Sequence, residues 1–455
     1  MACRRAHRLA VAAALGLSAL ACLVPATAAD WPQFGRTPRH TNANPSERAF
    51  TPENVATLEV KWNADMGANV AVQGGPVIAG GGLFVAGFDG MLKAYDIAGC
   101  GAAVCPPLWQ GRTDNDITTT PAVSGGRVVV SSADRFIHVF DASGCGAGIC
   151  DALWRGRLGA GAIDSSPTIA GGFIYVGDLS GQLSVFAFDG CGQDVCDPVW
   201  TAHAGPHEVL TSTPAVAGGS VFIQTTFNTD NDTSGRLLVF PDGCGAATCE
   251  VAWSARLGGQ TGNATGPLIA LGKVFVGSSR RFGIHRNPRE HVLAFDASGC
   301  GTAVCEPVQF FDVGPEGVDS SLALAGHMLY ASTDTSTDPN TAGVVMVFDI
   351  AQCGVHCKPA WTGVNFIDGF VSAAVVTQDV VFVGKGPALD IDAGVFAFDA
   401  RGCGQALCRA LTLVRPSDSG NYIGAPLAVA HDRIAFVNND NNLNRSQVTV
   451  IGLPD

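Results

Sequence analysis

The sequence predicts an eight-bladed β-propeller, and three observations support this fold class. A segment that reads Phe or Tyr-Asp, then Gly-Cys-Gly and a second cysteine recurs every 45 to 56 residues along the chain. Each repeat divides into four short apolar stretches separated by turn residues, with no 3.6-residue period. Repeats of this length that hold four antiparallel strands are typical of propeller blades.

One repeat illustrates the predicted blade. Residues 121–124 form a short apolar strand, and Gly125-Gly126 makes a tight turn. Residues 127–131 are β-branched, residues 136–141 alternate apolar and polar side chains, and a last strand opens at Trp154. These patterns favour strands joined by turns.

The blade count follows from the two ends of the repeat region. Seven repeats carry cysteines, and residues 426–450 supply three further strands of an eighth blade. Residues 58–62 match the fourth-strand pattern of Leu108-Trp109 and Leu153-Trp154. We therefore expect the N-terminal strand to complete the eighth blade, which removes the free sheet edges of an open ring.

The fourteen repeat cysteines are expected to form seven local disulfides that lock the outer hairpin of each blade. Zinc sites and free reactive thiols are the alternatives. The predicted pairs are Cys100–Cys105, Cys145–Cys150, Cys191–Cys196, Cys244–Cys249, Cys300–Cys305, Cys353–Cys357 and Cys403–Cys408.

Six of the seven tryptophans occupy the same fourth-strand position, where Gln309 and Thr412 stand in two other blades. A residue repeated in almost every blade indicates packing between neighbouring sheets rather than a cofactor platform.

The first residues are typical of an export signal. Arg4, Arg5 and Arg8 precede an apolar stretch over residues 9–24, and cleavage is expected near Ala28 or Ala29. We therefore predict a signal peptide over residues 1–29, a propeller over residues 30–455, and a secreted or periplasmic protein. No later stretch is apolar enough over sufficient length to predict a transmembrane segment.

The charge excludes two classes of partner. The formal net charge is −13, and removing the three signal arginines makes it more negative. Such a chain has no basic surface for nucleic acid or for an anionic membrane. We expect a monomer that binds an unknown protein or small molecule.

The irregular connections are all expected on one face of the ring. They join second to third strands over residues 228–234, 280–290, 334–342, 387–393 and 438–445. The Gly-Gly turns and cysteine loops of the other face are nearly uniform. Because specific binding concentrates in variable loops, the long-loop face is the predicted functional face.

Three groups of candidate residues lie there. Acidic residues of two loops could bind calcium or simply favour turns: Asp230, Asp232, Asp390 and Asp392. One basic loop could contact an anion or balance local charge: Arg280, Arg281, His285, Arg286, Arg289 and His291. Carboxylates that precede first strands could attract a cation at the channel mouth or cap the loop entrance: Asp116, Asp164, Glu208, Asp319 and Asp368.

Residues 31–35 (Trp-Pro-Gln-Phe-Gly), residues 51–55 (Thr-Pro-Glu-Asn-Val) and the blade ending at Trp154 resemble the pyrroloquinoline quinone (PQQ)-repeat superfamily. This superfamily contains PQQ-dependent alcohol dehydrogenases and BamB-type outer-membrane assembly factors. The resemblance spans the chain after the signal and implies an eight-bladed ring. For the enzymes it also implies PQQ with calcium, held by adjacent cysteines, and this sequence has no Cys-Cys pair.

The sequence therefore supports two hypotheses for the function. The first is an exported binding or scaffold module that acts through the long-loop face. The second is a PQQ-dependent dehydrogenase that oxidises an alcohol or sugar. The missing Cys-Cys pair favours the first, and no catalytic residue is assigned.

Overall fold

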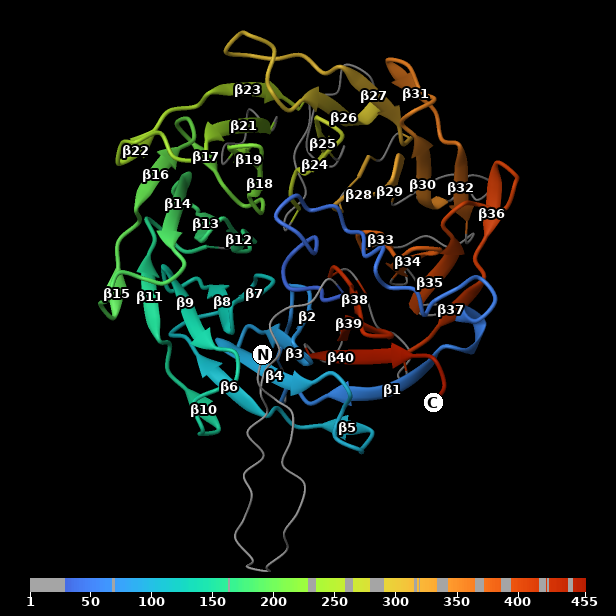
Figure 1. Cartoon of the computed structure of the whole chain (residues 1–455), viewed down its shortest axis with the longest axis horizontal. Coiled ribbons are helices and arrows are strands. Elements are labelled where there is room, and N and C mark those ends of the chain that lie inside the picture. Colours follow the sequence, from blue (N-terminus) through green and yellow to red (C-terminus); the bar gives the residue numbers. More distant parts are fainter. Residues whose placement is uncertain are drawn as a thin grey trace, which may run out of the picture.

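The structure, a computed structural model, describes residues 29–67, 70–162, 164–227, 235–257, 265–278, 290–314, 317–318, 320–333, 343–364, 372–385, 394–416, 423, 425–440 and 445–455. Eight sheets stand in a ring (Figure 1); each has four antiparallel strands, and six of them gain a fifth, parallel strand from the next blade. The predicted eight-bladed propeller is confirmed.

The four positions in a blade run from the channel outward. The first strands are β2 (Val77–Ala79), β7 (Ala122–Ser124), β12 (Thr168–Ala170), β18 (Ala215–Ala217), β24 (Leu268–Ala270), β28 (Ala323–Ala325), β33 (Val375–Val376) and β38 (Ala428–Ala430). The second strands are β3 (Gly82–Ala86), β8 (Arg127–Ser131), β13 (Phe173–Gly177), β19 (Ser220–Gln224), β25 (Lys273–Gly277), β29 (Met328–Ser332), β34 (Val380–Lys385) and β39 (Arg433–Asp440). The third strands are β4 (Met91–Asp96), β9 (Phe136–Asp141), β14 (Gln182–Ala187), β21 (Arg236–Pro241), β26 (Glu290–Asp296), β30 (Gly343–Asp349), β35 (Gly394–Asp399) and β40 (Arg445–Gly452). The fourth strands are β6 (Trp109–Arg112), β11 (Trp154–Arg157), β16 (Trp200–His203), β23 (Trp253–Arg256), β27 (Gln309–Asp312), β32 (Trp361–Val364), β37 (Thr412–Val414) and β1 (Glu59–Ala64).

A small extra sheet lies beside blade 4 and pairs β17 (Glu208–Val209) with β20 (Thr226–Phe227). The helical part of the described chain is the short 3₁₀ helix η1 (Val55–Thr57). Among the described residues, no helix has the length and apolarity needed to cross a membrane.

The eighth blade closes as predicted. Strand β1 pairs antiparallel with β40, and Trp62 lies opposite Val450. The sheet therefore joins residues that are almost 400 positions apart in the chain, and its inner and outer strands come from opposite ends of the sequence.

The cysteine loops do more than lock their own blade, so the expectation of a purely local hairpin was incomplete. All seven predicted disulfides are present. The end of each loop also pairs in parallel with the fourth strand of the preceding blade. We call the seven disulfide loops, together with these paired ends, clip loops. Six of them form two- or three-residue strands: β5 (Val104–Cys105), β10 (Ile149–Cys150), β15 (Val195–Cys196), β22 (Thr248–Cys249), β31 (His356–Cys357) and β36 (Leu407–Arg409).

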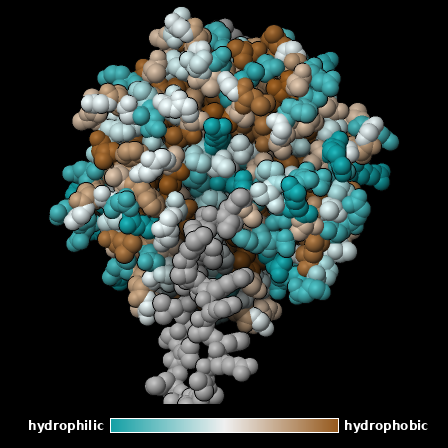
Figure 2. All heavy atoms as spheres, viewed as in Figure 1, coloured by the Kyte–Doolittle hydropathy of each residue, from teal (hydrophilic) through white to brown (hydrophobic). Residues whose placement is uncertain are grey.

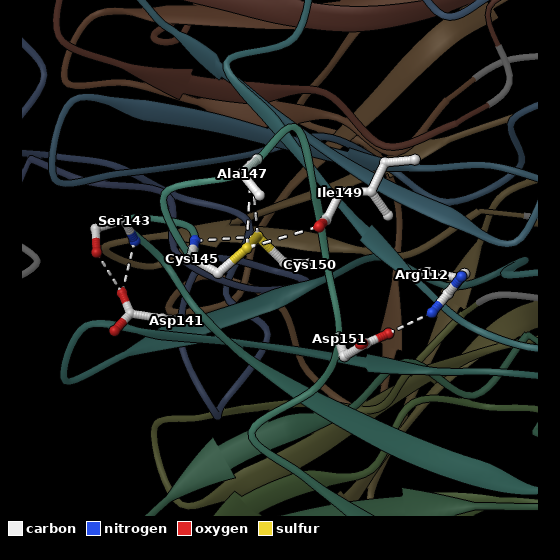
Figure 3. Close-up of a disulfide and its surroundings, with 8 residues drawn as sticks. All are labelled: Arg112, Asp141, Ser143, Cys145, Ala147, Ile149, Cys150 and Asp151. Carbon is white, nitrogen blue, oxygen red and sulfur yellow. Dashed lines mark hydrogen bonds and ion pairs between the residues drawn. A yellow bond between two sulfur atoms is a disulfide. The ribbon is translucent and has the colours of Figure 1, made fainter.

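The junction of blades 1 and 2 shows how a clip loop is held (Figure 3). Cys145 N–H donates to Cys150 Sγ at 3.0 Å, which tightens the loop around its disulfide. Ile149 and Cys150 lie in register with Gln110 and Gly111 of blade 1. An ion pair of 2.6 Å from Arg112 to Asp151 joins the same two blades. Each clip loop thus links neighbouring sheets across the ring.

The junction of blades 7 and 8 has a different closure, because blade 8 has no third-to-fourth connection of its own. The chain leading to β1 passes this junction, with η1 beside β37. Phe50 packs edge-on against Phe382 of blade 7 at 5.4 Å, and Val55 is fully buried in the same cluster. Apolar burial therefore takes the place of the missing clip loop.

The repeated tryptophans pack between sheets, as predicted. All six are buried. In five cases the indole lies against the glycine before the first cysteine of the next clip loop. The two substituted blades fit this arrangement: Gln309 faces the loop in which Gln352 replaces that glycine, and Thr412 faces the junction without a clip loop.

The N-terminal residues 29–44 form a strap across the middle of the ring, drawn in blue in Figure 1. An innermost strand leaves one edge of each sheet unpaired, and such an edge needs hydrogen-bond partners. The strap meets the second residue of every first strand in order around the ring. The pairs are Trp31 with Ile78, Pro32 with Val123, Gln33 with Ile169, Pro38 with Val216, Arg39 with Ile269, Thr41 with Leu324, Asn42 with Val376 and Asn44 with Val429.

The strap lies at the end of the channel where the first-to-second-strand turns gather. Asp30 accepts a hydrogen bond from Gly80 N–H at 3.3 Å, and its other oxygen contacts His431 at 2.5 Å. Glu47 accepts from Asp432 N–H at 3.1 Å. Gly80, His431 and Asp432 all belong to such turns. The N-terminal residues 29–47 therefore lie at the end of the ring where these turns gather.

The outer surface carries aliphatic residues on the clip loops, such as Val104, Ile149 and Leu407. On the face that Figure 2 shows, hydrophobic and hydrophilic residues are interspersed in small patches. Scattered apolar residues of this kind are normal for a protein surface.

Candidate functional site in the central channel

Small buried hydroxyl side chains at the entrances of the first strands link blades 1 to 4 through hydrogen bonds. Thr120 Oγ1 accepts from Gly75 N–H of blade 1 at 2.9 Å, and Thr120 N–H donates to Ser166 Oγ of blade 3 at 2.9 Å. Ser166 N–H donates in turn to Thr213 Oγ1 of blade 4 at 3.2 Å. Because these residues precede the first strands of successive blades, they form a buried polar wall along one arc of the ring.

Asp164 is the carboxylate of this wall. It is 4% exposed, and its backbone has a φ of +65°. Gln73 Nε2, from the entrance of blade 1, donates to Asp164 Oδ1 at 2.6 Å. The bond spans blade 2, whose Thr118 Oγ1 accepts from Asp164 N–H at 3.1 Å. Burial raises the pKa of Asp164 to about 6, so this carboxyl group changes charge near neutral pH.

His40 of the strap lies below the wall and is fully buried. Its Nδ1 is 3.1 Å from the carbonyl of Pro267, and Phe34 packs edge-on against the ring at 5.0 Å. Burial lowers the pKa of His40 to about 3, although the bond to Pro267 opposes this shift. The His40 ring is therefore neutral near pH 7.

The arc of blades 6 to 8 differs from the hydroxyl wall. Its buried side-chain atoms without a hydrogen-bond partner include Ser320 Oγ, Ser321 Oγ, Ser332 Oγ and both amide atoms of Asn438. Ser332 ends β29, and Ser321 lies two residues before β28 in the same blade. A buried polar group without a partner costs about 1–3 kcal/mol, so water or a ligand would be stabilised beside these atoms.

The carboxylates predicted at first-strand entrances have separate roles. Asp116 is half-buried, and its backbone carbonyl accepts from Ala133 N–H and Ser132 Oγ. Glu208 is buried and bound by Arg236 through two hydrogen bonds. Thr225 and Gly205 N–H also donate to it, which lowers the pKa of Glu208 in spite of its burial. Of the described members of this group, Asp164 alone forms a bond across the channel wall.

His291 corrects the predicted basic loop. It lies in β26, is 0% exposed, and its carbonyl accepts from Ser278 N–H at 2.8 Å. The sequence His-Val-Leu-Ala-Phe continues a buried strand, so His291 is not part of an exposed anion-binding surface. Likewise Asn438, expected in a loop, lies in β39, and Arg445 begins β40.

The other candidates lie outside the described residues. They are Asp230, Asp232, Arg280, Arg281, His285, Arg286, Arg289, Asp319, Asp368, Asp390 and Asp392. The strands that flank their segments end on the face opposite the first-to-second-strand turns, as the topology requires.

Sequence reasoning missed Gln73 and His40. Gln73 precedes blade 1 in the repeat position of the predicted carboxylates, but it carries no charge. His40 lies in a segment without periodicity. A comparison of equivalent repeat positions would have found Gln73 but not His40.

The comparisons with known proteins show the fold. No family model matches the chain, and no curated protein matches its sequence. Among solved structures, BamB from Moraxella catarrhalis is 14% identical with a TM-score of 0.55 and covers 87% of this chain and 98% of its own. The quinohemoprotein alcohol dehydrogenase ADHIIG from Pseudomonas putida HK5 is 13% identical with a TM-score of 0.63, over 94% of this chain and 80% of that one. A europium-containing methanol dehydrogenase is 12% identical with a TM-score of 0.62, over 94% and 98%.

These neighbours confirm that the chain has the propeller fold of the PQQ-repeat proteins. They include both an assembly factor and enzymes, so the fold alone does not choose between the two hypotheses.

The described residues do not fit the cofactor that the enzymes of this fold imply. In the described part of the chain, no three His, Cys, Asp or Glu side chains gather into a group that could hold a metal ion. The repeat cysteines are all engaged in local disulfides with three or four residues between the partners. We therefore derive no step through PQQ or calcium.

Proposed function

We propose that this protein is an exported binding propeller that receives a small molecule or protein on the face opposite its clip loops. The position of the strap is the observation that supports this proposal most directly. The strap bonds to the first strands of all eight blades, and its end contacts the turns between first and second strands. A ligand that reaches the polar wall around Asp164 must therefore enter from the other end.

Rigidity supports the same proposal. Seven disulfides, the clip strands and the strap hold the blades in fixed relative positions. A scaffold of this kind presents connections at one end without itself rearranging, which lowers the entropy cost of binding. Seven disulfides also fit an oxidising compartment, in agreement with an export signal.

Photo-crosslinking in the producing cell tests the face. A benzoylphenylalanine at exposed Asn115, in the connection between blades 1 and 2, reports on the proposed face. The same residue at exposed Ala246, on a clip loop, is the matched control. We expect specific adducts from Asn115 and none from Ala246; the reverse pattern would contradict the proposal.

Two further measurements separate this function from its alternatives. Purified protein incubated with PQQ and calcium should show no dye-linked oxidation of primary alcohols or sugars, and steady turnover would make it a dehydrogenase instead. N-terminal sequencing of the exported protein should begin at Ala29 or Asp30. An intact Met1 in the mature protein would exclude export by this signal.

A further inference from the structure

A cleft of about 710 Å³ opens between blades 4 and 5, away from the proposed functional face. Its walls come from the turn between β18 and β19, the turn between β24 and β25, and the end of β26. The side chains of Phe222, Trp253 and Ile269 form its apolar base. This volume is in the range of small-molecule sites, which are mostly apolar with a few polar groups.

The cleft lies where two small residues stand in place of the large ones found at another junction. Between blades 2 and 3, the ring of Phe188 lies 5.4 Å from the guanidinium of Arg127 and occupies the equivalent space. Phe188 N–H bonds to Gly172 O, just as Ala297 N–H bonds to Gly272 O in blade 5. Ala297 thus replaces the phenylalanine, and Ser220, which begins β19, replaces the arginine.

Leu271 at the rim carries a conformational cost. Two-residue turns of this type need positive φ at both positions, and glycine adopts it most easily. Equivalent turns have Gly-Gly in blades 1 to 4, whereas Leu271 has a φ of +52°. His431 and Asp432 also have positive φ, but His431 contacts Asp30 of the strap and Asp432 bonds to Glu47. Leu271 is 58% exposed and lines the cleft, so little packing within the protein offsets this cost.

The cleft also has cationic groups at its mouth. Arg39 of the strap is exposed there, and the described residues offer it no ion-pair partner. Lys273, which begins β25, and Asp296 of β26 also line the cleft and lie opposite one another in register. The Asp296 Oδ1 accepts from Ser298 N–H and Oγ at 2.9 and 2.6 Å, and its charge offsets that of Lys273. Arg39 is therefore the group that would attract an anion to this cleft.

We propose that the cleft between blades 4 and 5 binds a small amphipathic carboxylate. The Arg39 guanidinium receives the carboxylate, since its paired N–H groups match two carboxylate oxygens. The apolar body lies over Phe222 and Trp253, with Leu271 covering it from the rim. This site is independent of the face on which the proposed partner binds.

Octanoate is the probe, measured by isothermal titration calorimetry on the full oxidised protein, with octanamide as the neutral control. We expect saturable binding of octanoate that is at least tenfold tighter than that of octanamide. Arg39→Gln should weaken octanoate binding at least tenfold, whereas Arg48→Gln, an exposed arginine in the same N-terminal segment, should leave it unchanged. Absence of octanoate binding, or equal affinity for octanamide, would overturn the proposal.

Two further variants test the shape of the cleft. Ala297→Phe copies the filled junction of blades 2 and 3 and should abolish binding. Leu271→Gly should raise the melting temperature, because it relieves the positive φ, and yet weaken binding several-fold. If both variants bind octanoate as the parent does, the ligand lies elsewhere and the site assignment is wrong. A peptide with a C-terminal leucine that binds tenfold more tightly than octanoate would overturn the assignment of a small molecule.

Discussion

The indole of Trp109 in blade 1 packs against Gly144 in the clip loop of blade 2. Gly144 has a φ of +80°, and a Cβ added there would lie 2.8 Å from both Cγ and Cδ1 of the indole. One glycine therefore meets two requirements, a left-handed backbone and a close approach by the neighbouring sheet. The same pairing recurs around the ring, which makes it a repeated contact between blades.

Gly144→Ala should destabilise the protein more than Gly146→Ala. Gly146 has a φ of +79° and open space around it, so both substitutions share the backbone cost. Only the alanine at position 144 meets the indole, and overpacking adds about 1–3 kcal/mol. Urea unfolding under non-reducing conditions measures the difference, and equal midpoints would mean that the contact does not constrain the blades.

Replacing Cys145 and Cys150 together with serine should lower the free energy of unfolding by about 2 kcal/mol, since the closed loop is short. The clip strand should also loosen, because Ile149 and Cys150 pair with the neighbouring blade. Hydrogen exchange by mass spectrometry should show faster exchange over residues 145–151 and in the adjoining β6. If exchange rises in the loop alone, the loop does not link the two blades.

Asp164→Asn should stabilise the protein at pH 7.5 and have little effect at pH 3.5. The folded-state pKa of Asp164 is raised from 3.8 to about 6, so the fold favours the protonated form. Stability is thus lost as pH rises from about 4 through 6, by an amount on the order of 1–3 kcal/mol. Asparagine stays neutral and can still accept the bond from Gln73. A constant difference between parent and variant across this pH range would contradict the buried carboxyl.

His40 should have the opposite pH dependence. Its folded-state pKa is lowered to about 3 from 6.5, so its contribution is present above pH 6.5 and is lost as pH falls toward 3. His40→Asn keeps a residue that tolerates the φ of +54°. We expect this variant to be less stable at pH 7 but to lose less stability on acidification. Parallel stability curves for parent and variant would show that His40 does not titrate on unfolding.

The ring of blades could be predicted because its sequence pattern repeats. Segments without a repeat could not be predicted in the same way. The match of residues 58–62 to Leu108-Trp109 was sufficient to place the closing strand, because fourth strands share one pattern. The strap could not be predicted, since residues 29–44 have no period and bond mainly through backbone groups. His291 was wrongly assigned to the basic loop because it continues the run of basic residues over 280–291. The alternation of strand residues that begins at His291 is the signal that would have placed it in a strand.

The candidate site, too, could be predicted only where its residues follow the repeat pattern. Asp164 was found because carboxylates recur before first strands, but its bond to Gln73 skips one blade and no repeat pattern encodes it. The cleft between blades 4 and 5 is lined by Ser220 and Ala297, which are smaller than Arg127 and Phe188 at the equivalent positions. That difference is visible in the sequence only once the strands have been aligned by their hydrogen-bond register.

The central claim is that the N-terminal strap is bound to the whole ring and leaves the opposite end of the channel for a partner. Hydrogen exchange resolved to single amides tests it most directly in the full oxidised protein. The amides of Val123, Val216, Ile269, Leu324 and Val376 donate to the strap. We predict that they exchange as slowly as the amides of the central strand β9, because both open only when the ring unfolds. Fast exchange at these five amides, with β9 still protected, would show that the strap is not bound in solution and would contradict the account.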